Sequence, residues 1–177
     1  PGLIVDVYND IVVVQSSSQA IDKALEDIVG VLMEIYGKDI TVFEKSDQKS
    51  RSDIGLPFRR RFLKGRKEET VIREGNSKFI VNVVHGQKTG FFLDQRENRL
   101  FLEKIVEPGV KVLDLFSYTG GFGIHAANAG AKKVIFVESD RRAVEILKRN
   151  LKLNMVSDYE IYSVDVWEAL PRIVNEK

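Results

Sequence analysis

The sequence predicts an α/β chain in which three parallel strands of a doubly wound sheet follow a small α+β domain. Two observations lead to this prediction. In residues 1–86, strand-like runs precede and follow one amphipathic helical pattern. In residues 87–177, strand-like and helix-like segments alternate in the order typical of a parallel sheet. We therefore expect two domains with a border near residue 86.

The first domain begins with two apolar, β-branched runs, residues 3–6 and 11–14, joined around an Asn-Asp pair, which is typical of a β-hairpin. From Ser18 to Gly37, apolar residues recur every three or four positions, which predicts one amphipathic helix with a start and a stop signal. Further strands are expected at residues 40–43, 70–74 and 78–84. This order predicts a strand-strand-helix-strand-strand module.

The second domain begins with a short strand or turn that runs into a helix over residues 91–106. Strands are expected at residues 110–116, 133–137 and 160–164, and helices at residues 121–128, 141–154 and from residue 165 onward. Because consecutive parallel strands need a crossover helix, this alternation favours a parallel sheet with helices packed against it.

The composition excludes several classes of protein. The chain has 177 residues, 44% hydrophobic and 30% charged, and neither a long apolar run nor a secretory start, so we expect a cytoplasmic protein without a membrane segment. It has no cysteine, which excludes disulfides, thiolate metal ligands and a thiol nucleophile within these residues. Two histidines are too few to predict a His-rich metal site. A net charge of +1 indicates that neither half of the chain is uniformly basic.

A glycine-rich loop separates the strand at residues 110–116 from the helix that follows, with the sequence Tyr-Thr-Gly-Gly-Phe-Gly at residues 118–123. Glycines let the backbone approach a ligand at the carboxyl end of a strand, where open α/β sheets bind ligands. The spacing differs from G-x-G-x-x-G, and Asp114 places an anion where a dinucleotide pyrophosphate would lie. A cofactor with cationic sulfonium and ammonium groups fits this charge better than NAD.

Acidic residues occur at the ends of three successive predicted strands: Asp114, Glu138 and Asp165. The second can accept hydrogen bonds from both ribose hydroxyls, and the third can accept one from the exocyclic amine of adenine. Each also has a structural alternative, since Asp114 can cap a helix or turn, Glu138 can be a surface charge and Asp165 can be an N-cap. Their joint occurrence favours a site for a positively charged adenosine compound.

Two segments resemble the first motifs of the class I S-adenosylmethionine methyltransferases: DLFSYTGGFGIHAANAGA and VIFVESDRRAVEILKRNLKLN. The upstream HGQKTGFFLDQRENR is similar to a segment of one subgroup, the PUA-linked large-subunit ribosomal RNA cytosine-5 methyltransferases. Residues 1–86 also resemble the central domain of that subgroup. The resemblance implies an incomplete Rossmann-like methyltransferase sheet, S-adenosyl-L-methionine as cofactor, ribosomal RNA as partner and C5 of a cytosine as target. It implies neither a membrane nor a metal partner, and it leaves a homodimer open.

The resemblance also implies a set of cofactor-binding residues. They border the methionine end (Phe92, Asp94, Arg96), wrap the cofactor (Asp114, Phe116, Ser117, Tyr118, Gly120, Gly121, Phe122), hold the ribose (Glu138, Ser139) and meet the adenine (Asp165, Val166). Family members often have aspartate where this chain has glutamate at residue 138. As structural alternatives, the acid and arginine at residues 94 and 96 can start a helix and form an ion pair, and the phenylalanines can be core residues.

Family enzymes of this subgroup continue beyond the third strand to an Asp-Pro-Pro type motif and a cysteine that attacks C6 of cytosine. This sequence ends at Lys177 without a cysteine. We therefore expect a fragment that carries the cofactor-binding half, lacks catalytic residues and is inactive alone. We also expect a small RNA-binding domain to precede it in the full-length enzyme.

A basic cluster, FRRRFLKGRK, occupies residues 58–67 between predicted strands. Its six cations are Arg59, Arg60, Arg61, Lys64, Arg66 and Lys67, and its aromatic residues are Phe58 and Phe62. The cations can neutralise phosphates and the aromatic rings can stack on unpaired bases, which predicts RNA binding. The alternative is a solvated loop with its phenylalanines packed beneath it.

Three rival functions remain open. Methylation of guanine in the same RNA uses a very similar cofactor loop and needs no cysteine, so a cysteine beyond Lys177 would favour cytosine. A nonenzymatic RNA-binding module that keeps a vestigial cofactor fold is the second. An NAD-dependent oxidoreductase is disfavoured by Asp114 and by the glycine spacing.

Overall fold

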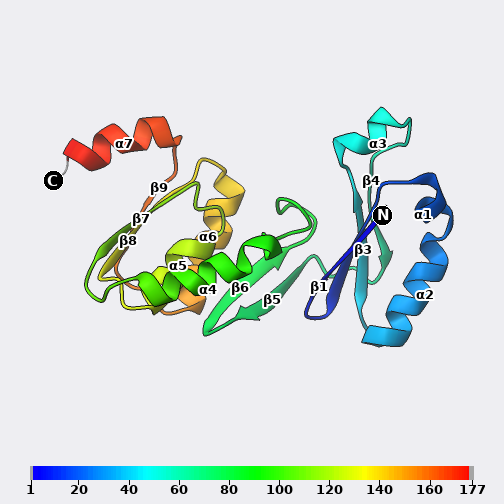
Figure 1. Cartoon of the computed structure of the whole chain (residues 1–177), viewed down its shortest axis with the longest axis horizontal. Coiled ribbons are helices and arrows are strands. Elements are labelled where there is room, and N and C mark those ends of the chain that lie inside the picture. The colour runs from blue at the N-terminus through cyan, green and yellow to red at the C-terminus, as the bar shows by residue number, and fades with distance from the viewer. Residues whose placement is uncertain (1, 176–177) are drawn as a thin grey trace. The chain divides into compact units, whose positions relative to one another are not determined.

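The structure, a computed structural model, describes residues 2–175, which form two compact units (Figure 1). The first unit comprises Pro1–Ile72 and Val81–Phe92, and the second comprises Arg73–Ile80 and Leu93–Lys177. Each unit has its own sheet. The predicted domain border at residue 86 stays a prediction.

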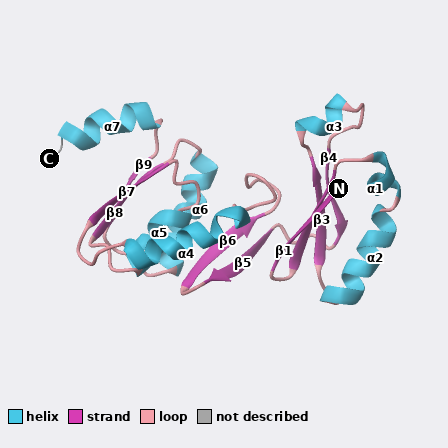
Figure 2. Cartoon of the chain, viewed as in Figure 1, coloured by secondary structure: helices cyan, strands magenta, loops and turns pink. Residues whose placement is uncertain are grey.

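The first unit contains a four-stranded sheet of order β1-β2-β3-β4 (Figure 2). Its strands are β1 (Leu3–Tyr8), β2 (Ile11–Ser16), β3 (Thr41–Ser46) and β4 (Arg59–Lys64). The first two form the predicted antiparallel hairpin, β3 runs parallel to β2, and β4 runs antiparallel to β3. The hairpin prediction is therefore confirmed, whereas β4 was not predicted.

Three helices belong to this unit: α1 (Gln19–Lys23), α2 (Leu25–Tyr36) and α3 (Lys49–Asp53). The Ser18 side chain caps α1 by accepting a hydrogen bond from the Ile21 N–H. The single predicted helix is interrupted at Ala24, whose N–H bonds to the carbonyls of both Ala20 and Ile21, which tightens the backbone. The apolar periodicity continues across the break, and α2 buries Leu25 and Leu32 against the apolar side chains of β2 and β3.

Strand β4 consists largely of cations, so no apolar alternation marks it in the sequence. It pairs with β3 at one edge of the sheet, and its register places Arg61 beside Glu44 and Arg60 beside Lys45. Residues 59–64 therefore form a strand and not the solvated loop of the alternative, whereas residues 65–67 lie outside any helix or strand. Its pairing with β3 fixes its extended conformation, because Phe62 packs against Phe43 and Arg61 pairs with Glu44.

A second hairpin follows, formed by β5 (Glu69–Glu74) and β6 (Ser77–Asn82). Gly75 lies in its turn with a φ of 56°, a left-handed conformation that glycine adopts without steric cost. The strands expected at residues 70–74 and 78–84 are therefore both present, although β6 ends two residues before the predicted strand.

The second unit alternates helices and strands as predicted. In order it contains η1 (Leu93–Gln95), α4 (Arg96–Ile105), β7 (Lys111–Leu115), α5 (Gly121–Asn128), β8 (Lys133–Val137), α6 (Arg141–Leu153), β9 (Tyr159–Tyr162) and α7 (Val166–Asn175). The three strands form one parallel sheet of order β7-β8-β9. In this register Leu115 pairs with Val137, and Val137 pairs with Tyr162, so the three carboxyl ends lie at one edge.

Helices cover both faces of this sheet. Gly123 of α5 lies against the Phe136 ring on one face, whereas Val137 packs with Val166 and Ala169 of α7. Because consecutive residues of a strand point to opposite faces, α5 and α7 lie on opposite sides of β8. The predicted Rossmann-like, doubly wound α/β architecture is confirmed. Within residues 2–175, no helix is long and apolar enough to cross a membrane.

Candidate cofactor-binding site

The loop between β7 and α5 has an unusual backbone. Phe116, Tyr118 and Gly120 have positive φ angles of 57°, 48° and 87°, so left-handed residues alternate with ordinary ones. For the two aromatic residues this conformation carries strain, which in proteins often accompanies ligand sites. The Phe116 side chain is 70% exposed, so core packing does not hold it in this conformation.

Two glycines of this loop and helix are required for close packing. A Cβ on Gly120 would collide with the Leu147 side chain, and one on Gly123 would collide with the Phe136 ring. Glycine at these positions therefore lets α5 approach the sheet and α6 closely. The sequence analysis assigned the glycines to the ligand, and the structure adds this packing role.

Asp114 is a half-buried residue of β7, one position before the strand ends. Its Oδ2 accepts a hydrogen bond of 2.8 Å from the Gly123 N–H in the first turn of α5. Burial, together with the nearby Glu138 carboxylate, raises the pKa of the Asp114 carboxyl to about 7, although the Gly123 bond opposes both. The predicted capping alternative is therefore present, and the carboxyl has a strongly perturbed pKa of the kind that clusters at functional sites.

Glu138 directly follows β8, and both of its carboxylate oxygens accept backbone hydrogen bonds. Oε2 accepts from the Tyr118 N–H at 2.8 Å, and Oε1 accepts from the Asp140 N–H at 2.8 Å. The alternative of a plain surface charge is therefore wrong. Glu138 holds the glycine loop next to the second strand, and each of its oxygens retains capacity for a further hydrogen bond.

Asp165 lies three residues beyond β9 and is exposed. Its Oδ1 accepts from the Trp167 N–H at 2.9 Å, and its carbonyl accepts from the Glu168 and Ala169 N–H groups, so it caps α7 as the structural alternative proposed. Its neighbour Val166 is buried, whereas Trp167 is 79% exposed. The second carboxylate oxygen remains available at this edge of the sheet.

The parallel register brings the three acids to the same edge. The Ser117 N–H bonds to the Val137 carbonyl at 3.0 Å, and the Glu138 N–H bonds to the Tyr162 carbonyl at 3.1 Å, so backbone bonds continue past the strand ends. Asp114 pairs with Phe136 in the sheet register, two residues before Glu138, so both acids lie near the ends of neighbouring strands. Carboxylate acceptors beside a glycine loop fit a cationic adenosine cofactor in charge and hydrogen bonding.

The remaining residues of the predicted cofactor-binding set differ in burial and in the unit to which they belong. Ser139 is exposed and Ser117 is buried, with its hydroxyl donating to the Val137 carbonyl. Asp94 in η1 and Arg96 at the start of α4 are both exposed, and Arg96 lies 3.9 Å from Glu97. Phe92 belongs to the first unit, where the Lys88 ammonium lies 4.6 Å from its ring centroid. A place for these residues beside a cofactor stays a prediction.

The sequence analysis missed a buried ion cluster in the second unit. Arg99 of α4 forms a bidentate pair with Glu74, and His125 of α5 lies between Glu74 and Glu103. Burial alone would raise the pKa of Glu74, but hydrogen bonds and charge from Arg99 and His125 outweigh it and lower this pKa to about 2. The only sequence signal was Arg99 itself, which ends the HGQKTGFFLDQRENR segment.

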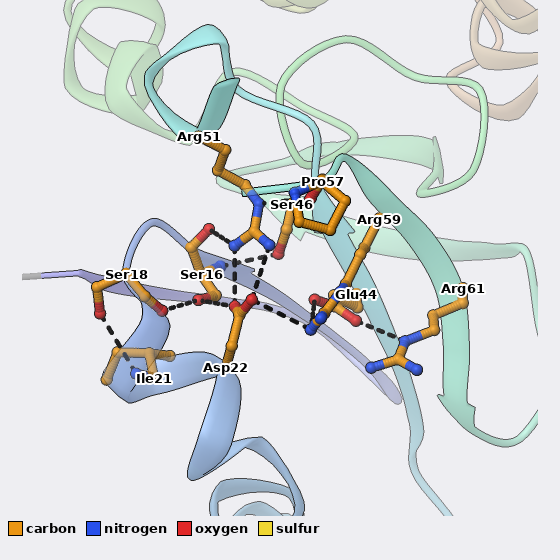
Figure 3. Close-up of polar contacts among 10 residues, drawn as sticks. All are labelled: Ser16, Ser18, Ile21, Asp22, Glu44, Ser46, Arg51, Pro57, Arg59 and Arg61. Carbon is orange, nitrogen blue, oxygen red and sulfur yellow. Dashed lines mark hydrogen bonds and ion pairs between the residues drawn. The ribbon is translucent and has the colours of Figure 1, made fainter. Parts of the chain in front are cut away.

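In the first unit, Figure 3 shows two arginines of the basic cluster, Arg59 and Arg61, in ion pairs with acids. Arg59 lies 3.2 Å from Asp22, and Arg61 donates to Glu44, a fully buried carboxylate, at 2.7 Å. Asp22 is also held by Arg51, whose hydrogen bonds lower the pKa of this carboxyl to about 2. Two of the predicted RNA-binding arginines therefore neutralise acids of their own unit.

The remaining cations of the cluster differ among themselves. Arg60 pairs with Asp47 at 3.6 Å, and Lys67 pairs with Asp10 at 2.5 Å, both with exposed side chains. Among residues 2–175, neither Lys64 nor Arg66 forms an ion pair. Arg66 lies 5.9 Å from the Phe62 ring centroid.

The two phenylalanines of the cluster also differ. Phe62 packs against Phe43 at a centroid distance of 4.9 Å, which fits the packing alternative. Phe58 is 58% exposed and is available for contact. Across residues 2–175, no group of three or more His, Asp or Glu side chains has an arrangement that could hold a metal ion.

Comparisons with known proteins identify the fold and the family. Residues 70–176 match the TRM5/TYW2 methyltransferase domain family. Ribosomal RNA large subunit methyltransferase I of Aliivibrio fischeri is 38% identical over 174 residues, which cover 96% of this chain and 43% of that protein. A Methanocaldococcus jannaschii protein, provisionally named a ribosomal RNA large subunit methyltransferase, is 41% identical over 177 residues, 99% of this chain and 45% of that protein.

Solved structures agree with these matches. A chain from Streptococcus mutans superposes with a TM-score of 0.81 and 25% identity, covering 99% of this chain and 45% of that one. TYW2 of P. horikoshii, solved in complex with MeSAdo, superposes with a TM-score of 0.69 and 22% identity, covering 92% of this chain and 55% of that one, a likeness of fold alone. The chain spans less than half the length of the curated relatives it matches.

Replacement of Asp114 by asparagine should stabilise the ligand-free protein at high pH. Between about pH 4 and pH 7 the unfolded chain has released this proton while the folded protein retains it, so the stability of the wild type falls as the pH rises through this window. Asparagine can accept the Gly123 bond without titrating. Thermal unfolding should show the two proteins alike near pH 4 and the variant more stable at pH 8, by an amount on the order of a few kcal/mol. A constant difference between these pH values would contradict the raised pKa.

Proposed function

The chain belongs to the TRM5/TYW2 methyltransferase domain family, and from that premise we propose that its protein transfers a methyl group from S-adenosylmethionine to a base of RNA. The observation that carries the proposal is the set of three carboxylates at one edge of a parallel sheet, next to a strained glycine loop. The rival function of an NAD-dependent oxidoreductase has no support in the family match, and the vestigial module is not favoured.

S-adenosylmethionine supplies an electrophilic methyl group when bound. In this proposal Asp114 balances the cofactor's positive charge, Glu138 accepts hydrogen bonds from the ribose hydroxyls, and Asp165 accepts one from the adenine amine. The full proposed contact set is Phe92, Asp94, Arg96, Asp114, Phe116, Ser117, Tyr118, Gly120, Gly121, Phe122, Glu138, Ser139, Asp165 and Val166. The family, and neighbours solved with SAH or MeSAdo, support this choice of cofactor.

Cofactor binding should strengthen as Asp114 ionises. With a pKa of about 7, this carboxyl is mostly protonated at pH 6 and mostly ionised at pH 8, and a cationic ligand binds the ionised form better. Calorimetry should therefore give a Kd for S-adenosylmethionine up to about 10-fold lower at pH 8 than at pH 6, with proton release on binding. The Asp114→Asn variant should bind more weakly and lose this part of the pH dependence, which controls for titration of the ligand's own amine. An unchanged profile in the variant would remove Asp114 from the site.

We propose C5 of a cytosine in large-subunit ribosomal RNA as the target. Two arguments support this choice: the 38% identity to ribosomal RNA large subunit methyltransferase I and the resemblance of the HGQKTGFFLDQRENR segment to the cytosine-5 subgroup. The attack on C6 needs a thiol, and residues 1–177 contain no cysteine, so the thiol would come from elsewhere in the full-length protein.

The methylated position can be read directly. The full-length protein, ribosomal RNA and isotopically labelled S-adenosylmethionine should yield labelled 5-methylcytidine after digestion to nucleosides and mass spectrometry. The same protein with Asp114→Asn provides the matched control and should transfer much less label. Labelled methylguanosine would support the guanine rival instead, and a lack of label in any nucleoside would contradict RNA methylation.

We further propose that the basic cluster of the first unit, Arg59, Arg60, Arg61, Lys64, Arg66 and Lys67, contacts RNA, with unequal contributions. Arg59 and Arg61 neutralise Asp22 and Glu44, so less of their charge is available to phosphates. Lys64 and Arg66 have no such partner among the described residues, and the exposed Phe58 can stack on an unpaired base.

Replacement of both Lys64 and Arg66 by alanine should weaken RNA binding and reduce its salt dependence. Removal of one cation–phosphate interaction lowers the slope of log K against log salt by about 1. The matched control is Arg59→Ala, which should lower the unfolding temperature because Asp22 and the buried Glu44 lose a cation. Binding measured at several salt concentrations and thermal unfolding of both variants separate the two effects. An unchanged salt slope in the double variant would discard this surface.

A further inference from the structure

Four charged or titratable side chains meet in the interior of the second unit. Glu74 ends β5, Arg99 and Glu103 lie one turn apart on α4, and His125 lies on α5. Arg99 Nε donates to Glu74 Oε1 at 2.6 Å, and its second nitrogen donates to Oε2 at 2.9 Å. His125 Nε2 lies 3.0 Å from Glu74 Oε1, and its Nδ1 lies 2.6 Å from Glu103 Oε1. One continuous network therefore connects β5, α4 and α5.

Three of the four side chains are buried and Glu103 is partly exposed, and burial of charge is costly. The side chains of Arg99 and Glu74 are 2% and 3% exposed, and His125 is fully buried. Buried ion pairs often contribute little net stability relative to apolar residues of similar volume, because desolvation offsets their attraction. A bidentate arginine–carboxylate pair does, however, fix the orientation of both planar groups. The network therefore contributes a defined geometry more than stability.

The geometry that Arg99 fixes is that of the first turn of α5. A Cβ on Gly121 would lie 3.1 Å from Arg99 Cδ, so the backbone of Gly121 rests directly on this side chain. The Arg99 guanidinium carbon also lies 5.9 Å from the Phe122 ring centroid. One turn further along α5, His125 is held by the same network. Arg99 thus supports the helix start on the side of α4.

The opposite side of this turn rests on the sheet. Gly123 lies against the Phe136 ring, and its N–H donates to Asp114 Oδ2 at 2.8 Å. The first turn of α5 is therefore clamped between Arg99, which contacts Gly121, and β7 and β8, which contact Gly123. A displacement at Gly121 would be passed to Gly123 within the same helical turn.

We infer that Arg99 is a positioning residue: it does not contact the cofactor but holds the first turn of α5 so that the Gly123 N–H points at Asp114. This inference deepens the proposed function and rests on it, since Asp114 is the proposed counter-ion of the cofactor. The groups that act on Asp114 are the Gly123 N–H from α5 and the Glu138 carboxylate at the end of β8.

The first test is Arg99→Lys, which keeps the charge but cannot form the bidentate pair with Glu74. The variant should bind S-adenosylmethionine about 10-fold more weakly at pH 8, because small misplacements at a binding site have effects of this size. The pH midpoint of binding should also rise, because the Gly123 bond lowers the Asp114 pKa and is weakened. A purely structural residue would leave that midpoint unchanged. Arg172→Lys, at an exposed ion pair with Glu168, is the matched control.

A second readout needs no ligand. The Gly123 amide shift in NMR spectra should follow the titration of Asp114, with a midpoint near pH 7 in the wild type and a higher one in Arg99→Lys. If the wild type shows this titration but does not bind S-adenosylmethionine, the proposed function is contradicted. The positioning role of Arg99 is then decided by the NMR midpoint of Arg99→Lys alone. A folded Arg99→Lys variant with wild-type affinity and midpoint overturns the inference.

The double variant Glu74→Leu/Arg99→Met covers the case in which Arg99→Lys does not fold. Removal of both charges leaves no unpaired ion, although His125 Nε2 loses its partner, so the double variant should still fold with a modestly lower unfolding temperature. It should still show the weaker binding and the raised midpoint. Wild-type binding in the folded double variant, or failure of both variants to fold, overturns the inference and assigns the network to folding alone.

Discussion

The hydrogen bond from the Gly123 N–H to the half-buried carboxyl of Asp114 ties the first helix after the glycine loop to the first strand of the parallel sheet. It requires that position 123 have no Cβ, because a larger side chain would collide with Phe136. Once α5 lies this close, the loop before it must turn sharply over the carboxyl end of β7. The left-handed Phe116 and Tyr118, and the capture of the Tyr118 N–H by Glu138, follow from this constraint.

The buried carboxyls of the chain differ in whether a cation neutralises them. Arg51 holds the pKa of Asp22 at about 2, and Arg99 with His125 does the same for Glu74, so both acids stay ionised within the fold. Within residues 2–175 no cation is paired with Asp114, and its pKa of about 7 makes its ionisation costly in the absence of a ligand. This uncompensated acid lies at the edge where open α/β sheets bind ligands, and it lowers the stability of the ligand-free fold. A bound cation would restore that stability.

Much of the second unit could be predicted from the sequence because apolar, strand-like runs alternate with helices, of which α4 and α6 carry clear periodic patterns. The three acids at the strand ends could be found because a parallel sheet brings consecutive strand ends together. Strand β4 could not be predicted, because four of its six residues are cations and no apolar alternation marks it in the sequence. The Arg99 network was missed because its partners are separated by 25 and 51 residues, and no local pattern connects them.

We propose that Asp114, Glu138 and Asp165 together form one site for a cationic adenosine compound. NMR titration of the isotopically labelled chain with S-adenosylmethionine tests it most directly, through the backbone amides that these carboxylates accept from: Gly123, Tyr118 and Trp167. The account predicts that all three amides shift and follow a single binding curve. Shifts confined to other regions, or three amides that respond at different ligand concentrations, would contradict it.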